Sequence, residues 1–372
     1  MLRVERITLR EIRLPLKEPF RISSGICTER RICLLELTSS DGVTGWSECV
    51  AGEQPNYSDE TIDTAWLAIR SWVAPRILKQ ELEGPGIVHA ILERDFRGHR
   101  MAKAAVEMGC WELAARLCDR PLAALLGGTR ERIVTGISLG LQASPEALVQ
   151  RARAAVQQGY KKIKLKIAPG ADVPYVRAVR EALGADVHLM VDANSAYTLD
   201  DAEWLRGLDA FDLLMIEQPL GRDDLVRHAA LQRLLKTPLC LDESITDVER
   251  AQDMITLQSG RIVNIKPGRV GGFAESIAIH DLCRRHGVPV WCGGMLESGI
   301  GRAHNVALAS LPNFTLPGDL SPSARYWERD IVTPEWTMDG DGMVHVPRTP
   351  GMGVAVDMDR VENLTVRSEV LA

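Results

Sequence analysis

One regular spacing constrains this sequence more than any other feature. In the middle of the chain, short apolar runs end in ionisable residues that lie 26, 25, 25 and 24 positions apart: Lys166, Asp192, Glu217, Asp242 and Lys266. A strand, a helix and two short loops of a βα unit take about that many residues. In a (β/α) barrel the carboxyl ends of the strands form one rim, where active sites are built. We therefore expect these five side chains to share the rim of a barrel.

The first of these strands lies within residues 161–167 (KKIKLKI), where lysine alternates with branched apolar residues. This period-2 pattern places Lys162, Lys164 and Lys166 on one face of a strand. Three like charges on one face destabilise a strand unless they are used or neutralised. By itself the stretch also fits an exposed edge strand protected by lysines. The carboxylates that follow at regular spacing favour an inner rim, where the lysines face acidic side chains.

The length of the chain predicts more than one domain. A chain of 372 residues is too long for one ordinary core, so a barrel and a second domain are expected. We place the barrel at residues 128–325, with amphipathic helices between the strands. Its first strand should begin near Arg132 and end near Ser138. The eighth strand, at residues 314–320, is short and broken by a proline.

Residues 1–127 predict a small α+β domain, because strand patterns up to about residue 50 are followed by helical ones. Residues 340–372 are expected to return to this domain and join it. Two of its predicted loops, 19–31 and 51–61, are candidates for a lid over an active site.

Composition narrows the class of protein. The formal net charge of −6 argues against nucleic acid or an anionic membrane as the main partner. No apolar run approaches the length of a membrane span, and charges interrupt the first residues too often for a signal peptide. Eight cysteines without a CxxC pair predict reduced, buried thiols and a cytoplasmic protein. No HxxxH or HExxH pattern supports a zinc site. We expect a homo-oligomer that acts on a small-molecule carboxylate.

Three carboxylates that converge at one rim repel one another unless a cation shares them. Asp192, Glu217 and Asp242 offer only oxygen, so a hard divalent ion fits them. Mg²⁺ fits best, because it keeps open positions for substrate oxygens, and Mn²⁺ or another divalent ion could replace it. The alternative is that each carboxylate separately caps the helix that follows it.

The lysines supply candidate bases on two sides of such a cation. A neighbouring ammonium and a metal both lower the pKa of a lysine towards neutrality. We expect Lys166 to act as the base, with Lys164 lowering its pKa and contacting a substrate carboxylate. Strands two and six face each other across the barrel, so Lys266 should lie on the opposite face of the substrate. Two bases would allow deprotonation from one side and reprotonation from the other, and one base would allow elimination.

Motifs along nearly the whole chain resemble those of a known family. The ordered set KxK, Asp, Glu, Asp and Lys is similar to that of the enolase superfamily, muconate-lactonizing-enzyme subgroup, which uses a Lys or His base with Mg²⁺. The resemblance is closer to its o-succinylbenzoate synthase / N-succinylamino acid racemase branch, through IKLKIAPG, VDANSAYT, IEQPL, LDESI, NIKPGRVGG and WCGGMLESGIGRAHN. It implies a (β/α)7β modified TIM barrel with an N-terminal α+β capping domain.

The resemblance also implies roles for individual residues. Asp192, Glu217 and Asp242 would be the Mg²⁺ ligands. Lys166 would abstract the proton alpha to a carboxylate. Lys266 would act mainly by its charge in the synthase and as the second acid/base in the racemase.

Further residues match positions that line the substrate pocket in this branch. We expect the backbone amides of residues 293–299 to receive a carboxylate or carbonyl oxygen. An arginine three residues after Lys266 looks like a feature of the members that racemise N-succinylamino acids, although a βα-loop arginine is usually just solvated. For the serine of the first strand, an ordinary strand-end hydroxyl is nearly as good an explanation. The predicted substrate-binding residues are Ser138, Lys164, Asn194, Arg269, Gly294 and Met295.

The first functional hypothesis is an o-succinylbenzoate synthase, which dehydrates the cyclohexadiene precursor (SHCHC) of menaquinone biosynthesis through an enediolate. The second is a racemase of N-succinylated or other N-acylated amino acids, or both activities in one site. Muconate cycloisomerisation and a non-catalytic carboxylate-binding barrel are more remote alternatives. The chain has no His–Asp arrangement in place of Lys266, which argues against mandelate-racemase chemistry. Asp319 stands without a DxD motif, which weakens a dipeptide epimerase interpretation.

Overall fold

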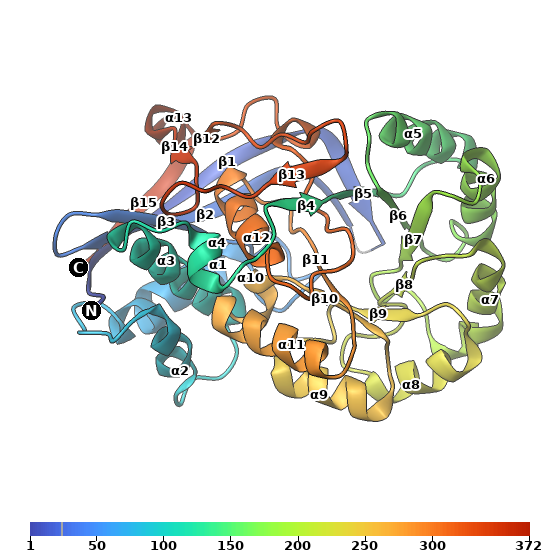
Figure 1. The fold of residues 1–372 in the computed structure, drawn as a ribbon, viewed down its shortest axis with the longest axis horizontal. Coiled ribbons are helices and arrows are strands. Elements are labelled where there is room, and N and C mark those ends of the chain that lie inside the picture. Colours follow the sequence, from blue (N-terminus) through green and yellow to red (C-terminus); the bar gives the residue numbers. More distant parts are fainter. Residues whose placement is uncertain (24) are drawn as a thin grey trace.

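The computed structural model describes residues 1–23 and 25–372. Figure 1 shows an α+β unit on one side, which contains both termini, and a barrel on the other. The sheet of the α+β unit has the strand order β15-β1-β2-β3. Its strands are antiparallel, and the last strand of the chain pairs with the first, Ile7 opposite Leu371. The strands are β1 (Val4–Ile22), β2 (Gly25–Ser39), β3 (Thr44–Cys49) and β15 (Thr365–Leu371).

Helix α3 (Arg100–Leu117) packs across this sheet and is buried over most of its length. Its close approach depends on small residues. A Cβ on Gly109 would lie 2.5 Å from the side chain of Leu37, and one on Gly45 would lie 2.6 Å from the backbone nitrogen of Leu113. The remaining helices of the unit are α1 (Ile62–Ala68), which continues into a π-helical turn (Ile69–Val73), α2 (Val88–Glu93) and α4 (Leu122–Leu126).

The segment 19–31 differs from the sequence prediction. It was expected to be a loop, but β1 and β2 continue through it as a long hairpin, with Phe20 opposite Cys27 and Ile22 opposite Gly25. The register shifts between Pro15 and Phe20. The hydroxyl of Ser23, at the tip, donates to the carbonyl of Ala193 in the barrel at 3.2 Å. The hairpin therefore reaches over the mouth of the barrel. Gly and Ser residues suggested a loop, but cross-strand hydrogen bonds override local propensity here.

The barrel contains seven parallel strands in the order β11-β10-β9-β8-β7-β6-β5. Each strand pairs with the next one in sequence, as βα units require. Seven of the eight predicted barrel strands are thus confirmed. They are β5 (Gly136–Leu139), β6 (Lys162–Lys166), β7 (His188–Asp192), β8 (Ile216–Glu217), β9 (Leu239–Leu241), β10 (Ile262–Ile265) and β11 (Val290–Cys292).

Residues 314–320 close the ring without forming a regular strand. Phe314 bridges to Val290 of β11, and Gly318 bridges to Thr135 beside β5. The amide of Asp319 donates to the carbonyl of Cys292 at 2.9 Å. Pro317 has no N–H to give to a ladder, which explains why only isolated bridges form. The eighth position of the barrel is therefore filled by an irregular segment.

Residues 132–134 were predicted to begin the first barrel strand. They form β4 (Arg132–Val134), which pairs antiparallel with β13 (Met343–His345) of the C-terminal segment. The first barrel strand starts only at Gly136. The other short pair in this region is β12 (Val332–Thr333) with β14 (Ala355–Val356).

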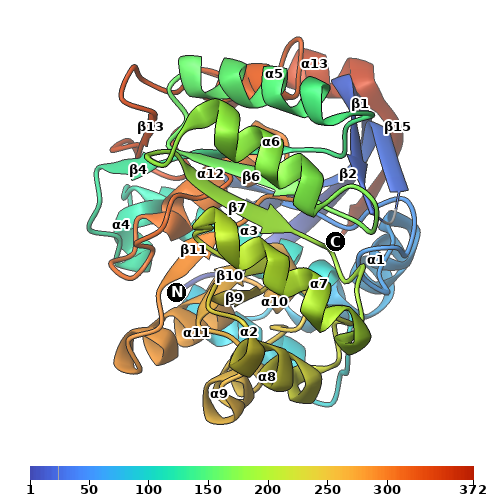
Figure 2. The same ribbon diagram turned by 90° about the vertical axis from the view of Figure 1, so that its right-hand side faces the viewer.

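Helices lie outside the barrel strands (Figure 2). Several begin at a side-chain cap: Ser144 accepts a hydrogen bond from the amide of Ala147, and Asp247 from that of Arg250. The helices of the barrel are α5 (Pro145–Gln157), α6 (Val173–Leu183), α7 (Ala202–Arg206), α8 (Leu225–Leu234), α9 (Val248–Leu257), α10 (Pro267–Val270), α11 (Phe273–Arg285) and α12 (Gly299–Ala309). The last helix, α13 (Met358–Leu364), precedes β15 and contacts β1 of the α+β unit.

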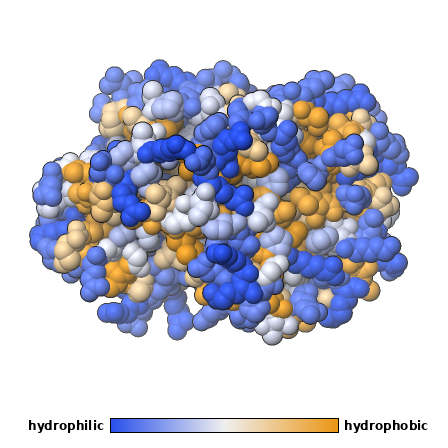
Figure 3. Space-filling view, in the orientation of Figure 1, coloured by the Kyte–Doolittle hydropathy of each residue, from blue (hydrophilic) through white to orange (hydrophobic). Residues whose placement is uncertain are grey.

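Polar and apolar side chains are interspersed on the face of the molecule in Figure 3. Within residues 1–23 and 25–372, no helix has both the length and the apolar character needed to cross a membrane. The eight cysteines are free thiols, most of them buried, although Cys118 is exposed.

Candidate active site

The three lysines of β6 point into the barrel. Lys162, Lys164 and Lys166 are all buried, and β6 lies between β5 and β7. The edge-strand interpretation of this stretch is therefore wrong. The register places Lys166 opposite Asp192, which in turn lies opposite Glu217. The rim predicted from the 24- to 26-residue spacing thus exists on these strands.

Two of these lysines form a network with the neighbouring carboxylates. Lys166 Nζ lies 2.6 Å from Asp192 Oδ2 and donates to Asn194 Oδ1, also at 2.6 Å. Lys164 Nζ lies 3.3 Å from Asp192 Oδ2 and 3.2 Å from Glu217 Oε2. Asp192 and Glu217 therefore converge on one positive charge. Asn194 was among the predicted substrate-binding residues.

Asp319 is a charge partner that sequence reasoning missed. Its carboxylate lies 2.6 Å from Lys164 Nζ and 3.1 Å from Lys162 Nζ. Lys162 Nζ also lies 3.7 Å from the ring centroid of Trp291, a cation–π distance. A signal was available in principle, because three buried ammonium groups need buried anions and Asp319 lies in the segment predicted to close the ring.

Lys266 occupies the opposite side of the mouth. It follows β10, the sixth position of the ring, whereas Lys166 ends β6, the second. Lys266 Nζ lies 2.6 Å from Asp242 Oδ2 and donates to Tyr57 Oη at 3.1 Å. Tyr57 in turn donates to Asp242 Oδ1 at 3.0 Å. Tyr57 was not predicted as a site residue, although its loop, 51–61, was.

Arg269 is buried behind Asp242. Its guanidinium forms an ion pair with the Asp242 carboxylate and donates to the carbonyls of Ile245 and Asn264 at 3.0 and 2.7 Å. It is therefore a neighbour of the Lys266 network rather than a solvated loop residue.

The charges at the mouth shift several pKa values. Burial would lower the pKa of Lys164, but the carboxylates of Asp319, Glu217 and Asp192 outweigh it, and the pKa lies well above its usual value. Lys164, which was expected to depress the pKa of a neighbour, is itself held firmly protonated. Burial also lowers the pKa of Lys266, and the charge of Asp242 reverses that shift, so its pKa is raised. The ion pairs, not lysine–lysine repulsion, dominate for these two groups.

For the carboxyl groups, burial raises the pKa and the neighbouring lysines lower it. Burial would raise the pKa of Asp192, but Lys166 and Lys164 lower it below its usual range. Glu217 behaves differently: burial, followed by the negative charge of Asp192, raises its pKa to about 8. The charge of Asp242 also raises it. At Glu217 the neighbouring lysines therefore do not fully compensate for burial and for repulsion by Asp192 and Asp242.

The donor set suits a hard cation. It consists of buried carboxylate oxygens on adjacent strands, and Lys164 Nζ already serves as a cation shared by Asp192 and Glu217. As the side chains stand, the described residues contain no group of three or more His, Cys, Asp or Glu placed to hold a metal ion. Each of the three carboxylates is instead ion-paired with a lysine. A divalent ion would have to displace these ammonium groups from the carboxylates. It can do so because it carries a stronger positive charge than an ammonium group.

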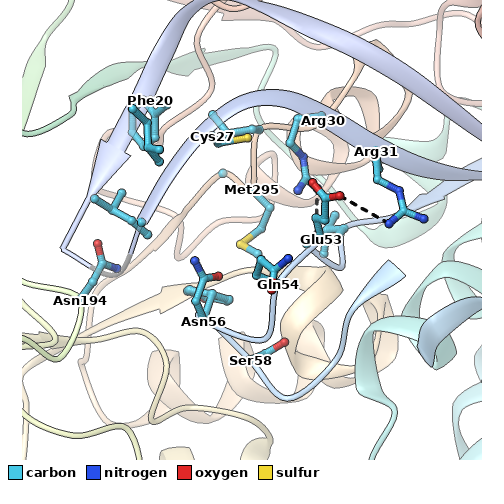
Figure 4. A pocket seen from close by; sticks show the side chains of 18 of the residues that line it. Phe20, Cys27, Arg30, Arg31, Glu53, Gln54, Asn56, Ser58, Asn194 and Met295 are labelled. Atoms are coloured by element: carbon cyan, nitrogen blue, oxygen red, sulfur yellow. Dashed lines mark hydrogen bonds and ion pairs between the residues drawn. The ribbon is translucent and has the colours of Figure 1, made fainter. Parts of the chain in front are cut away.

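A cavity of about 330 Å³ lies between the barrel mouth and the α+β unit. From the barrel it is lined by Lys166, Asn194, Lys266, Gly294 and Met295, and from the α+β unit by residues of both predicted lid segments (Figure 4). The hairpin and the loop 51–61 thus form its outer wall.

Three predicted pocket residues do not line this cavity. Lys164 is paired with Glu217 and Arg269 with Asp242, and neither these two cations nor these two carboxylates line the cavity. Ser138 is buried opposite Lys164 in the register, and its Oγ has no hydrogen-bond partner among the described residues. The tertiary arrangement places these three behind the wall of the cavity.

The amides of residues 293–299 were expected to receive a substrate oxygen. Four of them are already used within the protein. The amide of Gly293 donates to the carbonyl of Ile265 at 3.3 Å. The amide of Met295 donates to Glu297, that of Ser298 to Glu48 at 3.3 Å, and that of Gly299 to Asp330. The prediction is wrong for these four amides, because acceptors of the protein itself satisfy them first.

A (β/α)7β barrel with buried lysines and carboxylates at its mouth, closed by an α+β unit, defines a class: barrel enzymes that act on small molecules in a capped site. Comparison with known families agrees. A family described as "Enolase C-terminal domain-like" matches residues 147–360, and one described as "Mandelate racemase / muconate lactonizing enzyme, N-terminal domain" matches residues 5–127. The chain belongs to the enolase superfamily. Membership implies a divalent metal ion.

Individual relatives cover the whole chain. An o-succinylbenzoate synthase from Geobacillus kaustophilus is 49% identical over 97% of this chain and 96% of its own length. An N-succinylamino acid racemase from Amycolatopsis sp is 47% identical, with 96% of each protein covered. A solved enolase superfamily member from Listeria innocua has a TM-score of 0.96 at 40% identity, over 100% of this chain and 99% of that one.

Proposed function

We propose that this protein is an o-succinylbenzoate synthase, which dehydrates the cyclohexadiene precursor of menaquinone biosynthesis. The observation that carries this proposal is that Lys166 and Lys266 both line the cavity, and that Asp192 and Asn194 hold the Nζ of Lys166 in place. Relatives of that name, 45–49% identical over nearly the full length, support the reaction.

In this proposal Lys166 removes the proton alpha to the substrate carboxylate. Its Nζ takes that proton, the electron pair moves into the carboxylate to give an enediolate, and the carbon–oxygen bond to the leaving hydroxyl then breaks. The Lys166 ammonium returns the proton to the departing hydroxide, which leaves as water. Lys266 places a second positive charge on the other side of the planar intermediate. The hairpin and loop over the cavity exclude bulk water.

We assign Asp192, Glu217 and Asp242 as the ligands of Mg²⁺, which Mn²⁺ or another divalent ion could replace. When bound, the ion supplies positive charge to the substrate carboxylate and so favours the loss of its alpha proton. The convergence of Asp192 and Glu217 on Lys164 and the raised pKa of Glu217 support this assignment.

Racemisation of N-succinylamino acids is the second candidate. The position of Lys266, across the ring from Lys166 and on the same cavity, favours it, because racemisation needs a proton acceptor on one face and a donor on the other. Arg269 and Tyr57 hold the Asp242–Lys266 pair in place. Two relatives, 47% and 45% identical, are named N-succinylamino acid racemase.

We further propose that residues 1–127, joined by residues 340–372, form a capping domain over a catalytic barrel at 128–325. The pairing of β15 with β1 supports this division. We also propose a homo-oligomeric, cytoplasmic enzyme, and the free cysteines are compatible with a reducing compartment.

Two assays with the Mg²⁺-loaded protein test the proposal. One follows aromatic product from the cyclohexadiene precursor, and the other follows alpha-proton exchange and optical rotation of an N-succinyl-L-amino acid in D₂O. Lys166→Ala should abolish both activities, while Lys161→Ala, which removes an exposed lysine next to the same strand, should leave both unchanged. No turnover of either substrate by the unmodified protein would refute the proposal and leave muconate cycloisomerisation or carboxylate binding without catalysis.

A further inference from the structure

Arg30 is a buried cation in the outer wall of the cavity. It lies on β2 two residues before Ile32 and four before Leu34, whose side chains belong to the core shared with the barrel. Because side chains alternate along a strand, Arg30 faces the barrel as they do. It lines the same cavity as Lys166 and Lys266, on the side formed by the α+β unit (Figure 4).

Arg30 differs from the other buried cations in its partners. In the described part of the chain, seven other lysine and arginine side chains are buried, and each reaches a carboxylate within 4.0 Å. Arg30 is only 7% exposed, yet it takes part in no ion pair with a described residue. Its Nη2 donates to the carbonyl of Val50 at 3.1 Å, and its Nε is buried without a hydrogen-bond partner in the same set of residues.

The carboxylates near this wall are engaged elsewhere. Glu29 pairs with Arg13 at 3.0 Å. Glu53 lies 3.7 Å from the guanidinium of Arg31. Glu60 accepts hydrogen bonds from two backbone amides at the start of α3. Glu48 feels the charge of Arg30, but it accepts hydrogen bonds from Ser298 and Gly301, and burial raises its pKa to about 8. None of these four side chains forms an ion pair with Arg30.

A buried charge without a partner destabilises a protein by several kcal/mol, so its retention suggests an anion that arrives from outside. A guanidinium with free N–H groups matches a carboxylate in geometry and charge. The far wall of the cavity therefore offers a carboxylate site separate from the reacting end at the barrel mouth.

We propose that Arg30 binds the distal carboxylate of a dicarboxylate substrate, the one at the end of a succinyl-type arm, and so selects dicarboxylates over substrates with a neutral acyl group. This inference rests on the proposed function, because it assigns the other carboxylate to the mouth between Lys166 and Lys266. Both candidate substrates, the synthase precursor and an N-succinylamino acid, carry such a second carboxylate. A cavity of about 330 Å³ is at the small end of ligand pockets and suits a compact diacid.

The test compares ligands that differ only at the distal end. Isothermal titration measures the Kd of o-succinylbenzoate and of its half ester, methylated on the succinyl carboxylate, against the Mg²⁺-loaded protein. A charge-assisted hydrogen-bonded pair of this kind corresponds to about a 10- to 100-fold difference in Kd. The unmodified protein should therefore bind the diacid about that much more tightly. Equal Kd values for diacid and half ester would overturn the inference without any variant.

Variants then assign the preference to Arg30. Arg30→Met should raise the Kd of the diacid about 10- to 100-fold and leave that of the half ester within about 3-fold. Arg30→Lys should keep part of the preference, and it replaces the methionine variant if that one does not fold. Arg13→Met, which removes an exposed charge from the neighbouring strand, should keep the full preference. An equal loss for both ligands would indicate a structural role and refute the inference.

Turnover separates this inference from the proposed function. If Arg30→Met raises the KM of an N-succinylamino acid but not that of the N-acetyl form, both stand. If the unmodified enzyme turns over the proposed substrates but Arg30→Met does not change this selectivity, only the inference fails. If neither substrate reacts while the Kd preference holds, the proposed function fails and the dicarboxylate site remains.

Discussion

Replacing Glu107 with alanine should loosen the attachment of the α+β unit to the barrel. Glu107 lies on α3 and is completely buried, and its carboxylate accepts hydrogen bonds from the amides of Phe273 and Ala274 at 2.7 and 3.0 Å. Those amides belong to the N-terminus of α11, so a side chain of one unit caps a helix of the other. The indole of Trp111 donates to the same carboxylate at 2.7 Å.

The structure sets the size of the effect. Alanine leaves three buried donors without their acceptor, at about 1–3 kcal/mol each, and water that enters the vacated space recovers part of that. We expect the free energy of unfolding to fall by about 3 kcal/mol. A chain of 372 residues has an unfolding entropy of about 0.8 kcal/mol/K, so Tm should fall by about 4 °C.

The effect should also depend on pH. Burial raises the pKa of Glu107 to about 7, although its hydrogen bonds oppose that shift. Between the ordinary glutamate pKa of 4.5 and about 7, the folded protein therefore holds a proton that the unfolded chain has lost. The stability contributed by this proton is complete below pH 4.5 and is lost as the pH rises through 7. The alanine variant lacks this group, so its stability does not fall in this way. The difference in the free energy of unfolding between the unmodified protein and the variant should therefore be about 2 kcal/mol smaller at pH 8 than at pH 5.

Urea unfolding at pH 5 and pH 8, followed by circular dichroism, measures the loss of unfolding free energy in the variant and the change of that loss with pH. Glu131→Ala removes an exposed glutamate whose ion pair with Arg348 is also exposed, and it should change stability by less than about 0.5 kcal/mol. The reasoning is refuted if Glu107→Ala behaves like that control, or if its deficit is larger at pH 8 than at pH 5.

Two further predictions concern the reaction. Lys266→Arg should retain more elimination than racemisation, because a guanidinium keeps the positive charge but does not exchange protons near neutral pH; equal loss of both activities would contradict the separate roles of the two lysines. Chelation of divalent ions should abolish turnover and added Mg²⁺ should restore it, with Asp192→Asn raising the Mg²⁺ concentration needed for half-maximal binding in a calorimetric titration. Full activity after exhaustive chelation would rule out the metal assignment.

The barrel could be predicted because its evidence is local and repeated. Each run from β6 to β10 carries its apolar core residues and its terminal ionisable residue within a few positions, and the run recurs at the length of a βα unit. The helix cap at Ser144 is equally local. The structures that such local patterns predict are found in the folded protein, because tertiary packing favours the same structures.

The hairpin at 19–31 and the eighth barrel position could not be predicted in the same way. In the first, strand pairing between Phe20 and Cys27 overrides a Gly/Ser-rich stretch. In the second, Pro317 breaks the strand pattern, yet the segment still closes the ring through bridges to residues far away in the chain. Both outcomes depend on contacts with residues outside the local stretch of sequence.

The sequence alone determined which strands would bring Lys166, Asp192, Glu217, Asp242 and Lys266 to one rim, because strand period and unit length act along the chain. Only the tertiary structure decided the partners that complete the site. Asp319 and Tyr57 each come from a segment outside that repeat, and their contacts arise where the closing segment and a loop of the α+β unit meet the barrel strands. The physical reason is that a buried charge is balanced by whatever lies near it in space, and distance in space is set by packing rather than by position in the chain.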